Sequence, residues 1–287
     1  MSPLPDRYAV VGNPVAHSQS PFIHSEFARQ TDQLMTYTRL LSPLDGFAAT
    51  VREFAASGAR GCNVTVPFKF EVPALAQHAS PRVLLAQAAN TLRFDAQGWH
   101  AENTDGLGLR QDLEVNAGFK LQGRHVLLLG AGGAAAGVLG PLIEARPALL
   151  QVINRTAAKA QDLVQRHADL ASEYGVQLCA SSLQPEELRP QGYELIINAS
   201  SSSLQGDTTP IPPQAIGSGC LVLDMMYGPA SQPFLQWAAS YGAATRDGLG
   251  MLVEQAAEAF AFWRGIRPAT ADVLRALRER VNAAPAP

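Results

Sequence analysis

The chain has 287 residues, of which 47% are hydrophobic and 16% are charged, and its formal net charge at pH 7 is −3. This balance lacks the basic excess of proteins that bind nucleic acid or an anionic membrane surface, so neither partner is expected. There is no signal-peptide pattern at the N-terminus and no apolar run near the ~20 residues that cross a bilayer, which predicts a cytoplasmic protein.

Apolar runs that end in Gly, Asn or Pro alternate with amphipathic stretches through the first hundred residues. At the start of SPFIHSEFARQ, Ser20 is expected as a helix N-cap and Pro21 as the first helical residue. The alternation predicts a mostly parallel sheet that is covered by helices. The expected strands are 7–12, 35–41, 61–67 and 90–94, and the expected helices are 20–30, 44–58 and a stretch through 83–89.

A second series of strands and helices begins near residue 124. Its strands are continuous apolar runs, which is typical of parallel strands buried on both faces. Single cores rarely exceed about 250 residues, so two α/β domains are expected. The strands of this series are expected at 124–130, 149–154, 193–200 and 220–227, and two further helices at 248–265 and about 270–281.

The glycine-rich segment GAGGAAAG follows an apolar strand and precedes a helix. Gly130 permits a tight turn, while Gly132 and Gly133 let backbone N–H groups approach a pyrophosphate at the positive end of the helix. The pattern alone is weak, because a tight strand-to-helix turn also serves packing. The surrounding βαβ unit favours a dinucleotide site, in which Ala131 and Ala134 complete the loop.

The residues after the next strand indicate which dinucleotide fits. An Asp or Glu there usually binds the ribose 2′-hydroxyl of NAD and would repel a 2′-phosphate. In this chain Asn154, Arg155 and Thr156 occupy the place, and Lys159 follows one helical turn later. Two cations and a hydroxyl near one anion predict NADP as the cofactor. The alternative is an ordinary solvated helix start, although cations are slightly unfavourable there.

Two polar segments follow strands in the first half of the chain: NVTVPFK, which contains Lys69, and ENTDG, which contains Asp105. Each could be structural, since a lysine after a proline turn is usually solvated and ENTDG could form only an Asx turn. Both nevertheless stand where an apolar strand ends, and open α/β sheets bind ligands at the carboxyl ends of their strands. Together they predict a site.

Nine segments along nearly the whole chain form a pattern more specific than any single motif. They are VVGNPVAHSQSP, GCNVTVPFK, AANTL, ENTDGLG, LLGAGGAAAGV, INRT, LIINASSS, DMMYGP and DGLGMLVEQAA. In this order they resemble the shikimate dehydrogenase family. The resemblance implies an α/β fold: an N-terminal α/β catalytic domain with a mostly parallel sheet, plus a Rossmann-type NADP-binding domain. It also implies the NADP-dependent interconversion of 3-dehydroshikimate and shikimate.

The resemblance also implies a domain division and individual roles. The catalytic domain is expected at 1–105 and the NADP domain at 106–247, with helices of 248–287 returning to the catalytic domain. Lys69 and Asp105 match the catalytic pair. The substrate-side matches are Ser18 and Ser20 for the carboxylate, Thr65, Asn90 and Gln255 for the ring hydroxyls, and Tyr227. The expected cofactor-binding residues are Gly130, Ala131, Gly132, Gly133, Ala134, Asn154, Arg155, Thr156, Lys159, Met225, Gly248 and Met251.

Two alternatives remain beside this interpretation. One is a quinate/shikimate dehydrogenase with broader substrate or NAD use, which expects an acid near Asn154. The other is a non-catalytic NADP-binding sensor, which expects loss of Lys69 or Asp105. Neither feature is found in the sequence. The chain departs from the family pattern at Ser203, where a glycine is frequent, and at Ala135 and Ala136, where relatives can carry Ser and Arg.

The remaining reactive side chains predict no metal site. The three cysteines, Cys62, Cys179 and Cys220, are far apart and form no C-x-x-C pair, so reduced core cysteines are expected. His17 and His24 flank the serine-rich segment, but Pro21 lies between them and a shared ligand role is not expected. The expected partner is a small-molecule substrate, and the expected assembly is a monomer or homodimer.

Overall fold

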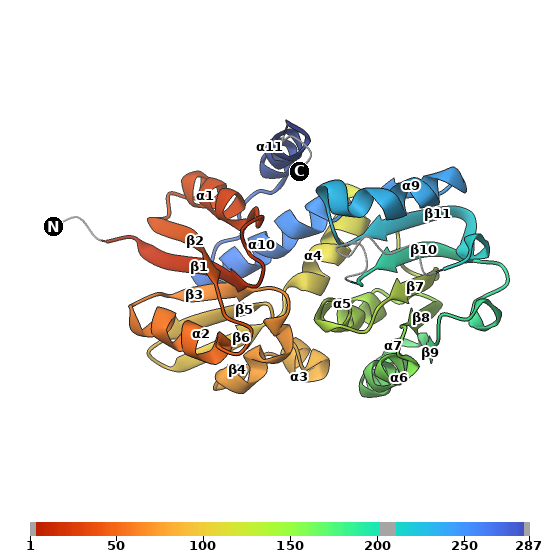
Figure 1. Ribbon diagram of the computed structural model, residues 1–287, viewed down its shortest axis with the longest axis horizontal. Helices are drawn as coiled ribbons and strands as arrows, with labels where there is room; N and C mark the ends of the chain where they lie inside the picture. Colours follow the sequence, from red (N-terminus) through yellow and green to blue (C-terminus); the bar gives the residue numbers. More distant parts are fainter. Residues whose placement is uncertain (1–3, 201–210, 284–287) are drawn as a thin grey trace.

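The computed structural model describes residues 4–200 and 211–283, which form two lobes side by side (Figure 1). Each lobe is built around a six-stranded sheet. The first lobe contains β1 (Asp6–Gly12), β2 (Met35–Leu41), β3 (Gly61–Val64), β4 (His78–Ala79), β5 (Thr91–Asp95) and β6 (Gly98–Glu102). The second lobe contains β7 (His125–Leu129), β8 (Leu149–Ile153), β9 (Gln177–Ser181), β10 (Tyr193–Asn198), β11 (Ile216–Asp224) and β12 (Ala244–Arg246).

The helices cover these sheets and connect them. In chain order they are α1 (Ser20–Gln30), α2 (Phe47–Ala56), α3 (Pro81–Ala86), α4 (Asp105–Gln111), α5 (Gly133–Glu144), α6 (Ala157–Arg166), α7 (Ala168–Tyr174), α9 (Gln232–Ser240), α10 (Leu249–Arg264) and α11 (Ala271–Ala283). Two shorter segments are the 3₁₀ turn η1 (Phe68–Phe70), which carries Lys69, and the π-helical turn η3 (Asp112–Asn116), which directly continues α4.

The first sheet has the strand order β2-β1-β3-β5-β6-β4, and three of its five pairings are parallel. Strand β5 runs antiparallel to β6 because only a short turn separates them, and such a turn cannot join parallel strands. Helix α2 packs on one face, while α1 and α10 pack on the other. The mostly parallel sheet is confirmed, and β4 and β6 are strands that the sequence interpretation did not include.

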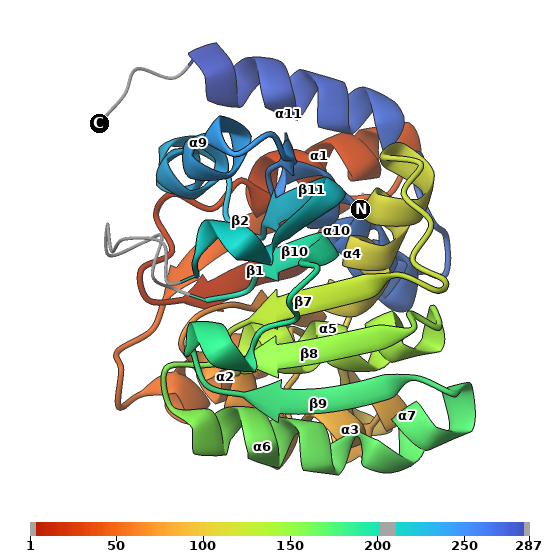
Figure 2. The ribbon, with the colours of Figure 1, turned by 90° about the vertical axis from the view of Figure 1, so that its right-hand side faces the viewer.

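The second sheet is parallel throughout, with the order β12-β11-β10-β7-β8-β9. This is the Rossmann order, in which the chain reverses direction across the sheet between β7 and β10. Figure 2 looks onto this lobe. Buried clusters lie on both faces, with α5, α6 and α7 on one and α9 on the other, which explains why β7, β8 and β10 are continuous apolar runs.

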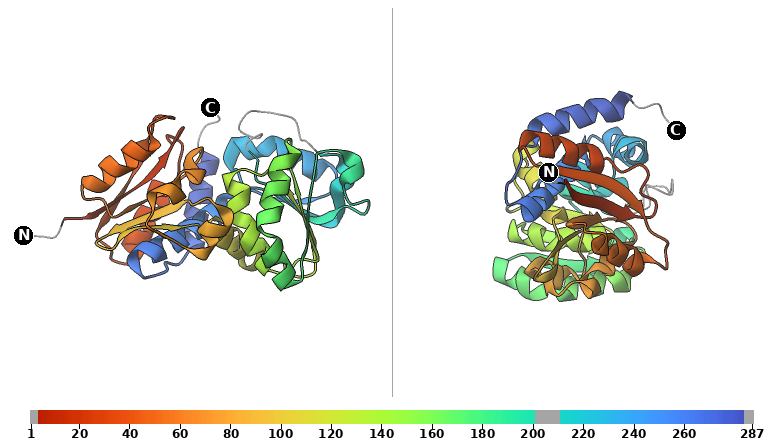
Figure 3. Two further views of the ribbon diagram at one scale, coloured as in Figure 1. Left: turned by 90° about the horizontal axis from the view of Figure 1, so that it is seen from below. Right: turned by 90° about the vertical axis from the view of Figure 1, so that its left-hand side faces the viewer.

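Helices α4 and α10 pack against each other between the two lobes (Figures 1 and 3). Helix α5 of the second lobe packs on α4, and Ala86 and Ala88 of the first lobe belong to the same buried cluster as α5. Helix α10 shares a second cluster with α1 and α11. The C-terminal helices therefore pack on the first lobe, and α4 and α10 join the two lobes at their junction.

Several local expectations were wrong. Ser20 is the first residue of α1, and the N-cap is Gln19, which makes no side-chain capping hydrogen bond. Strand β3 ends at Val64 because the chain then turns, with the N–H of Phe68 donating to the carbonyl of Thr65 at 3.1 Å. Strands β9 and β12 were not expected, since the first is a half-exposed edge strand and the second has three residues.

Candidate active site

A cavity of about 1490 Å³ lies between the lobes, which is more room than most single small-molecule pockets offer. It is lined by residues of both lobes and of α10. All the site residues expected from the sequence line it: Ser18, Ser20, Thr65, Lys69, Asn90, Asp105, Gly130, Ala131, Gly132, Gly133, Ala134, Asn154, Arg155, Thr156, Lys159, Met225, Tyr227, Gly248, Met251 and Gln255.

The topology explains why these distant segments meet. The segments after β1 and β3 and those after β7 and β8 leave the carboxyl ends of parallel strands, and in each sheet such ends share one edge. The serine segment follows β1, Thr65 follows β3, the glycine loop follows β7, and Asn154 follows β8. The carboxyl-end edges of the two sheets face each other across the junction of the lobes. All four segments therefore line one cavity.

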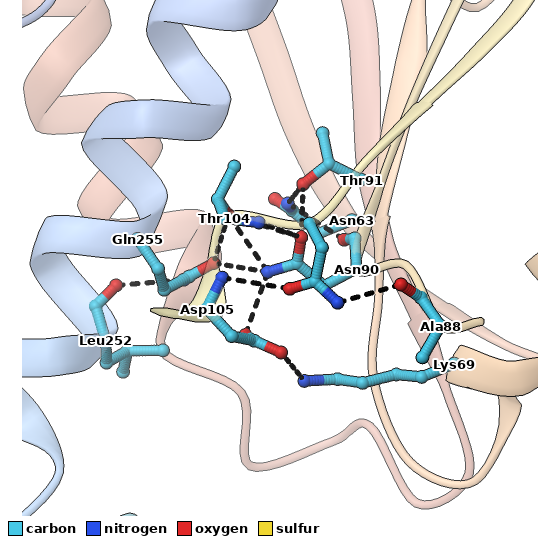
Figure 4. Close-up of polar contacts among 10 residues, drawn as sticks. Asn63, Lys69, Ala88, Asn90, Thr91, Thr104, Asp105, Leu252 and Gln255 are labelled. Atoms are coloured by element: carbon cyan, nitrogen blue, oxygen red, sulfur yellow. Dashed lines mark hydrogen bonds and ion pairs between the residues drawn. The ribbon is translucent and has the colours of Figure 1, made fainter. Parts of the chain in front are cut away.

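Lys69 and Asp105 form an ion pair inside the cavity (Figure 4). Lys69 is carried by η1, and Asp105 is the first residue of α4. The distance from Lys69 Nζ to Asp105 Oδ2 is 2.5 Å, and the two side chains are 13% and 6% exposed. A shielded pair of this kind holds the ammonium in one place and leaves its other protons free for a bound molecule.

Asn90 holds the other oxygen of Asp105. Its Nδ2 donates to Asp105 Oδ1 and to Thr104 Oγ1, each at 2.9 Å, and lies 3.2 Å from Gln255 Oε1 (Figure 4). Its Oδ1 accepts from the backbone N–H of Thr104 and from the hydroxyl of Thr91, each at 2.9 Å. The Asn90 amide is therefore fixed from several directions, and it orients Asp105 toward Lys69.

A group of hydroxyls lines the part of the cavity after β1. Ser18 Oγ lies 3.2 Å from Ser20 Oγ, and the backbone N–H of Ser20 donates to Ser18 Oγ at 3.3 Å. The guanidinium of Arg39 donates to the Ser18 carbonyl through Nε at 3.0 Å and Nη2 at 2.6 Å. Tyr227 also lines the cavity, and burial raises the pKa of its hydroxyl. Several neutral donors thus lie close to a cation.

The glycine loop has the geometry that a pyrophosphate site requires. Gly130 has φ +106°, and a Cβ at this residue would lie 3.1 Å from the Ala199 carbonyl oxygen, so glycine is needed. Gly132 is the N-cap of α5 and has open space beside it. The first N–H groups of α5 therefore face the cavity with the positive end of the helix dipole. Ala135 and Ala136 are buried in the core and Ser203 lies outside the described residues.

Arg155 and Lys159 line the cavity beyond this loop. Asn154 braces the turn, because its Nδ2 donates to the Thr156 carbonyl at 2.9 Å. Within residues 4–200 and 211–283, neither Arg155 nor Lys159 makes an ion pair with a carboxylate. Both charges are therefore available to an anion in the cavity.

Sequence reasoning missed Asn63 as a residue of this cavity. Its Nδ2 donates to Thr91 Oγ1 at 3.0 Å, and its Oδ1 accepts from the Tyr37 hydroxyl at 2.7 Å. The signal that could have identified Asn63 is the alternation of side-chain direction along β3 and Thr65, which follows the strand. Cys62 and Val64 point into the core, so Asn63 and Thr65 share the opposite face.

His24 does not reach the cavity, whereas His17 does. The ring of His24 is fully buried and stacks on Tyr37, with 4.2 Å between ring centroids. Burial lowers the pKa of His24 to about 3, so the ring is neutral at ordinary pH. His24 is therefore a packing residue of the first lobe.

A Rossmann sheet whose glycine loop shares a cavity with a shielded lysine–carboxylate pair is typical of dinucleotide-dependent dehydrogenases. Three family models match the chain: the shikimate dehydrogenase substrate binding domain over 10–92, shikimate / quinate 5-dehydrogenase over 113–203, and the shikimate 5′-dehydrogenase C-terminal domain over 248–278. A protein of Methylibium petroleiphilum named shikimate dehydrogenase (NADP(+)) is 58% identical, over 97% of this chain and 96% of its own. The chain belongs to the shikimate dehydrogenase family.

Solved structures agree with this assignment. An Ael1 enzyme from Pseudomonas putida is 44% identical, with a TM-score of 0.85 over 95% of this chain and 98% of its own. A shikimate 5-dehydrogenase from Thermus thermophilus, solved in complex with NADP(H) and shikimate, is 30% identical, with a TM-score of 0.80 over 96% and 99% of the two chains. Among the described residues, no helix is both long and apolar enough to cross a membrane.

Proposed function

We propose that the protein catalyses the reversible NADPH-dependent reduction of 3-dehydroshikimate to shikimate, a reaction of aromatic amino-acid biosynthesis. The observation that carries this proposal is the shared cavity: the Lys69–Asp105 pair and the glycine loop line the same space. The names of the most similar relatives, which are NADP(+)-dependent shikimate dehydrogenases, support the same reaction and cofactor.

The chain's own residues handle the proton of this reaction. Bound NADPH supplies the hydride. In the proposed mechanism Lys69 donates a proton to the carbonyl oxygen of 3-dehydroshikimate as the hydroxyl forms, and accepts it in the reverse direction. Asp105 holds the Lys69 ammonium, and Asn90 holds Asp105. This geometry supports proton transfer because the pair is shielded from water at 13% and 6% exposure.

The substrate is held by short polar side chains. We assign its carboxylate to Ser18 and Ser20, and its ring hydroxyls to Thr65, Asn90 and Gln255, with Tyr227 on the same side. A polyhydroxylated acid suits such a site, since each polar group left unpaired in a closed cavity costs about 1–3 kcal/mol. A substrate that lacks one of these groups should therefore be rejected strongly.

The cofactor is assigned to the second lobe. We assign the pyrophosphate to the loop from Gly130 to Ala134. We assign the 2′-phosphate to Asn154, Arg155, Thr156 and Lys159. Gly248, Met225 and Met251 are assigned to the nicotinamide end. Among residues 4–200 and 211–283, Arg155 and Lys159 form no ion pair with a carboxylate, and this supports NADP over NAD because a 2′-phosphate would supply the negative charge that pairs with them.

The domain division and the assembly are also proposals. We divide the chain into a catalytic domain at 1–105, an NADP domain at 106–247 and returning helices at 248–287. The packing of α11 and α10 on α1 supports this division. We infer a cytoplasmic enzyme, present as a monomer or homodimer, that binds neither nucleic acid nor membranes.

One assay tests the proposed function. The absorbance of reduced nicotinamide is followed with purified protein, using shikimate or quinate against NADP or NAD. Rapid turnover is expected with shikimate and NADP, and much slower turnover with the other three combinations. Efficient quinate or NAD use would favour the broader quinate/shikimate dehydrogenase, and binding of NADP without any turnover would favour a sensor.

A further inference from the structure

The buried side chain of Asn103 joins the two backbone segments that carry Lys69 and Asp105. Asn103 is 0% exposed. Its Oδ1 accepts from the backbone N–H of Asp105 at 3.2 Å, and its Nδ2 donates to the carbonyl of Ala88 at 2.9 Å. The next residue, Ala89, donates its N–H to the carbonyl of Lys69 at 3.0 Å. One amide therefore connects, in a few hydrogen bonds, the main chains on both sides of the ion pair.

The two contacts also fix the orientation of this amide. A backbone N–H requires the oxygen of Asn103, and a backbone carbonyl requires its NH₂ group. Rotating the amide by half a turn would replace both hydrogen bonds with repulsions. Since a buried polar group without a partner is costly, Asn103 has one stable position. It can therefore act as a rigid spacer beneath Lys69 and Asp105.

Helix α5, which begins at the cofactor loop, packs its glycine face on this spacer. A Cβ at Gly137 would lie 2.7 Å from Asn103 Oδ1 and 2.8 Å from Asn103 Nδ2, closer than real side chains come. Four residues earlier, on the same face of the helix, a Cβ at Gly133 would lie 3.0 Å from Lys69 Cβ. One helix face thus contacts the stem of Lys69 and the side chain that holds Asp105.

The backbone beside Asp105 meets the same helix. A Cβ at Gly106 would lie 2.7 Å from the carbonyl oxygen of Gly137 and 2.5 Å from Pro141 Cγ. Helix α4 therefore lies so close to α5 that only glycine fits at either contact. Because interiors are close-packed, a group added at Gly137 has no space to enter except by moving Asn103.

We propose that Asn103 is a positioning residue for the Lys69–Asp105 pair, and that Gly137 reserves the space that lets Asn103 hold the pair at its working separation. The helix that presents its N-terminus to the pyrophosphate then also fixes the geometry of proton transfer. This inference rests on the proposed function, because it assigns a role toward the same reacting pair.

The test compares two alanine substitutions in the same helix. Gly137→Ala forces Asn103 to move, whereas a Cβ at Gly140 would meet only Leu85 Cδ2 at 3.5 Å and Leu170 Cδ2 at 3.8 Å, which are ordinary contacts. Both changes favour the helix equally, since alanine is the better helix former. Gly140→Ala is therefore the matched control and should keep wild-type turnover of shikimate.

For Gly137→Ala we expect kcat with shikimate and NADP to fall about 10²-fold, with the KM for shikimate and the Kd of NADP unchanged within roughly threefold. This split separates positioning from structural damage, which would weaken ligand binding as well. Asn103→Ser, which cannot span both backbone contacts, should lower kcat to a similar degree. The double variant should be no worse than the single ones, because both changes act through the same displacement.

Normal kcat in Gly137→Ala would overturn the inference, as would weakened NADP binding with kcat retained. If Gly137→Ala does not fold, the Asn103→Ser variant provides the test. Turnover by Asn103→Ser within about threefold of wild type would then overturn the inference. Crystal structures of wild type and Gly137→Ala test it without turnover: Asn103 displaced and the Lys69–Asp105 distance lengthened support it, and an unmoved pair contradicts it. Wild-type protein that does not oxidise shikimate would contradict the proposed function alone.

Discussion

A short stretch of chain sets the position of Lys69, whereas segments far away in the sequence form its surroundings. The turn after β3 places it in η1, but Asp105 and the glycine face of α5 shield it. Sequence patterns identify the first part, since a polar residue after a buried strand stands at the ligand edge of the sheet. They do not identify Asn63 or Asn103, because both work through side-chain hydrogen bonds that form only when remote segments pack together.

Replacing Lys69 tests the proton-transfer role directly. We expect Lys69→Met to lower kcat by about 10²–10⁴-fold, the usual contribution of a positioned acid-base group, with substrate and NADP affinities kept within about tenfold. Steady-state kinetics with shikimate and NADP measure the first effect, and fluorescence titration measures the second. Lys120→Met, at an exposed position, is the control. Equal turnover in both variants would mean that Lys69 does not transfer the proton.

Replacing Arg155 tests the choice of cofactor. Removing one charge-assisted contact to the 2′-phosphate should cost about 1.5–3 kcal/mol, so Arg155→Asp should reduce the preference for NADP over NAD by roughly 10–10²-fold. The ratio of kcat/KM for the two cofactors measures it. Arg52→Asp, which makes the same change of charge at an exposed position in the first lobe, should leave the ratio unaltered. An unchanged ratio in Arg155→Asp would remove Arg155 from the phosphate site.

Strands and helices were predictable where burial leaves a strong pattern. Strands β7, β8 and β10 are buried on both faces, and each could be predicted from its run of Leu, Ile and Val. Strands β4, β9 and β12 are short or lie at sheet edges, where the pattern fades because water covers one side. The position of α10 on the first lobe could be expected only through the family resemblance, since no local pattern says which sheet a helix covers.

An ion pair fixes the place where the chain returns from the second lobe. Arg246 at the end of β12 binds Asp112 of η3 through two contacts, Nε to Oδ2 at 2.7 Å and Nη2 to Oδ1 at 2.5 Å. Asp112 is 0% exposed, and its hydrogen bonds raise the pKa of Arg246. Gly250 lies against the same carboxylate and leaves no space for a side chain. The pair therefore joins η3 to the end of β12, just before α10 begins at Leu249.

Breaking this pair should be costly. Arg246→Met leaves the Asp112 carboxylate buried without its partner, so we expect the free energy of unfolding to fall by about 3–5 kcal/mol. Urea denaturation measures the change. The control is Arg275→Met, whose ion pair with Asp272 is exposed at 69% and 78% and should contribute only about 0.3–0.5 kcal/mol. Similar losses of unfolding free energy in the two variants would show that the Arg246–Asp112 pair does not stabilise the fold.

The two lobes form one molecule through a junction that is both apolar and polar. Ala86, Ala88 and Met251 share a buried cluster with α5 and β7, while α4 and α10 cross between the sheets. Each lobe also buries one neutral histidine: His24 beside Tyr37 in the first, and His167 between α6 and α7 in the second. Protonation of these rings in acid should therefore destabilise each lobe through its own histidine.

The pH dependence of unfolding tests these histidines. Burial lowers the pKa of His24 to about 3 and that of His167 to about 4, both below the usual 6.5. Above pH 6.5 each is neutral whether the chain is folded or unfolded. Below it the unfolded chain binds the proton first, so each histidine lowers the free energy of unfolding by about 1.4 kcal/mol per pH unit, until the pH reaches the folded-state pKa.

The substitution His24→Phe isolates one of these contributions, since it keeps a ring against Tyr37 and removes the titrating group. Urea denaturation of wild type and variant at pH 7.5, 5.5 and 4.5 is the measurement. From pH 7.5 to 4.5 the wild type should lose about 2.7 kcal/mol more than the variant, because two pH units lie below 6.5 and one proton is involved. Equal losses in the two proteins would mean that His24 takes up its proton while the chain is still folded.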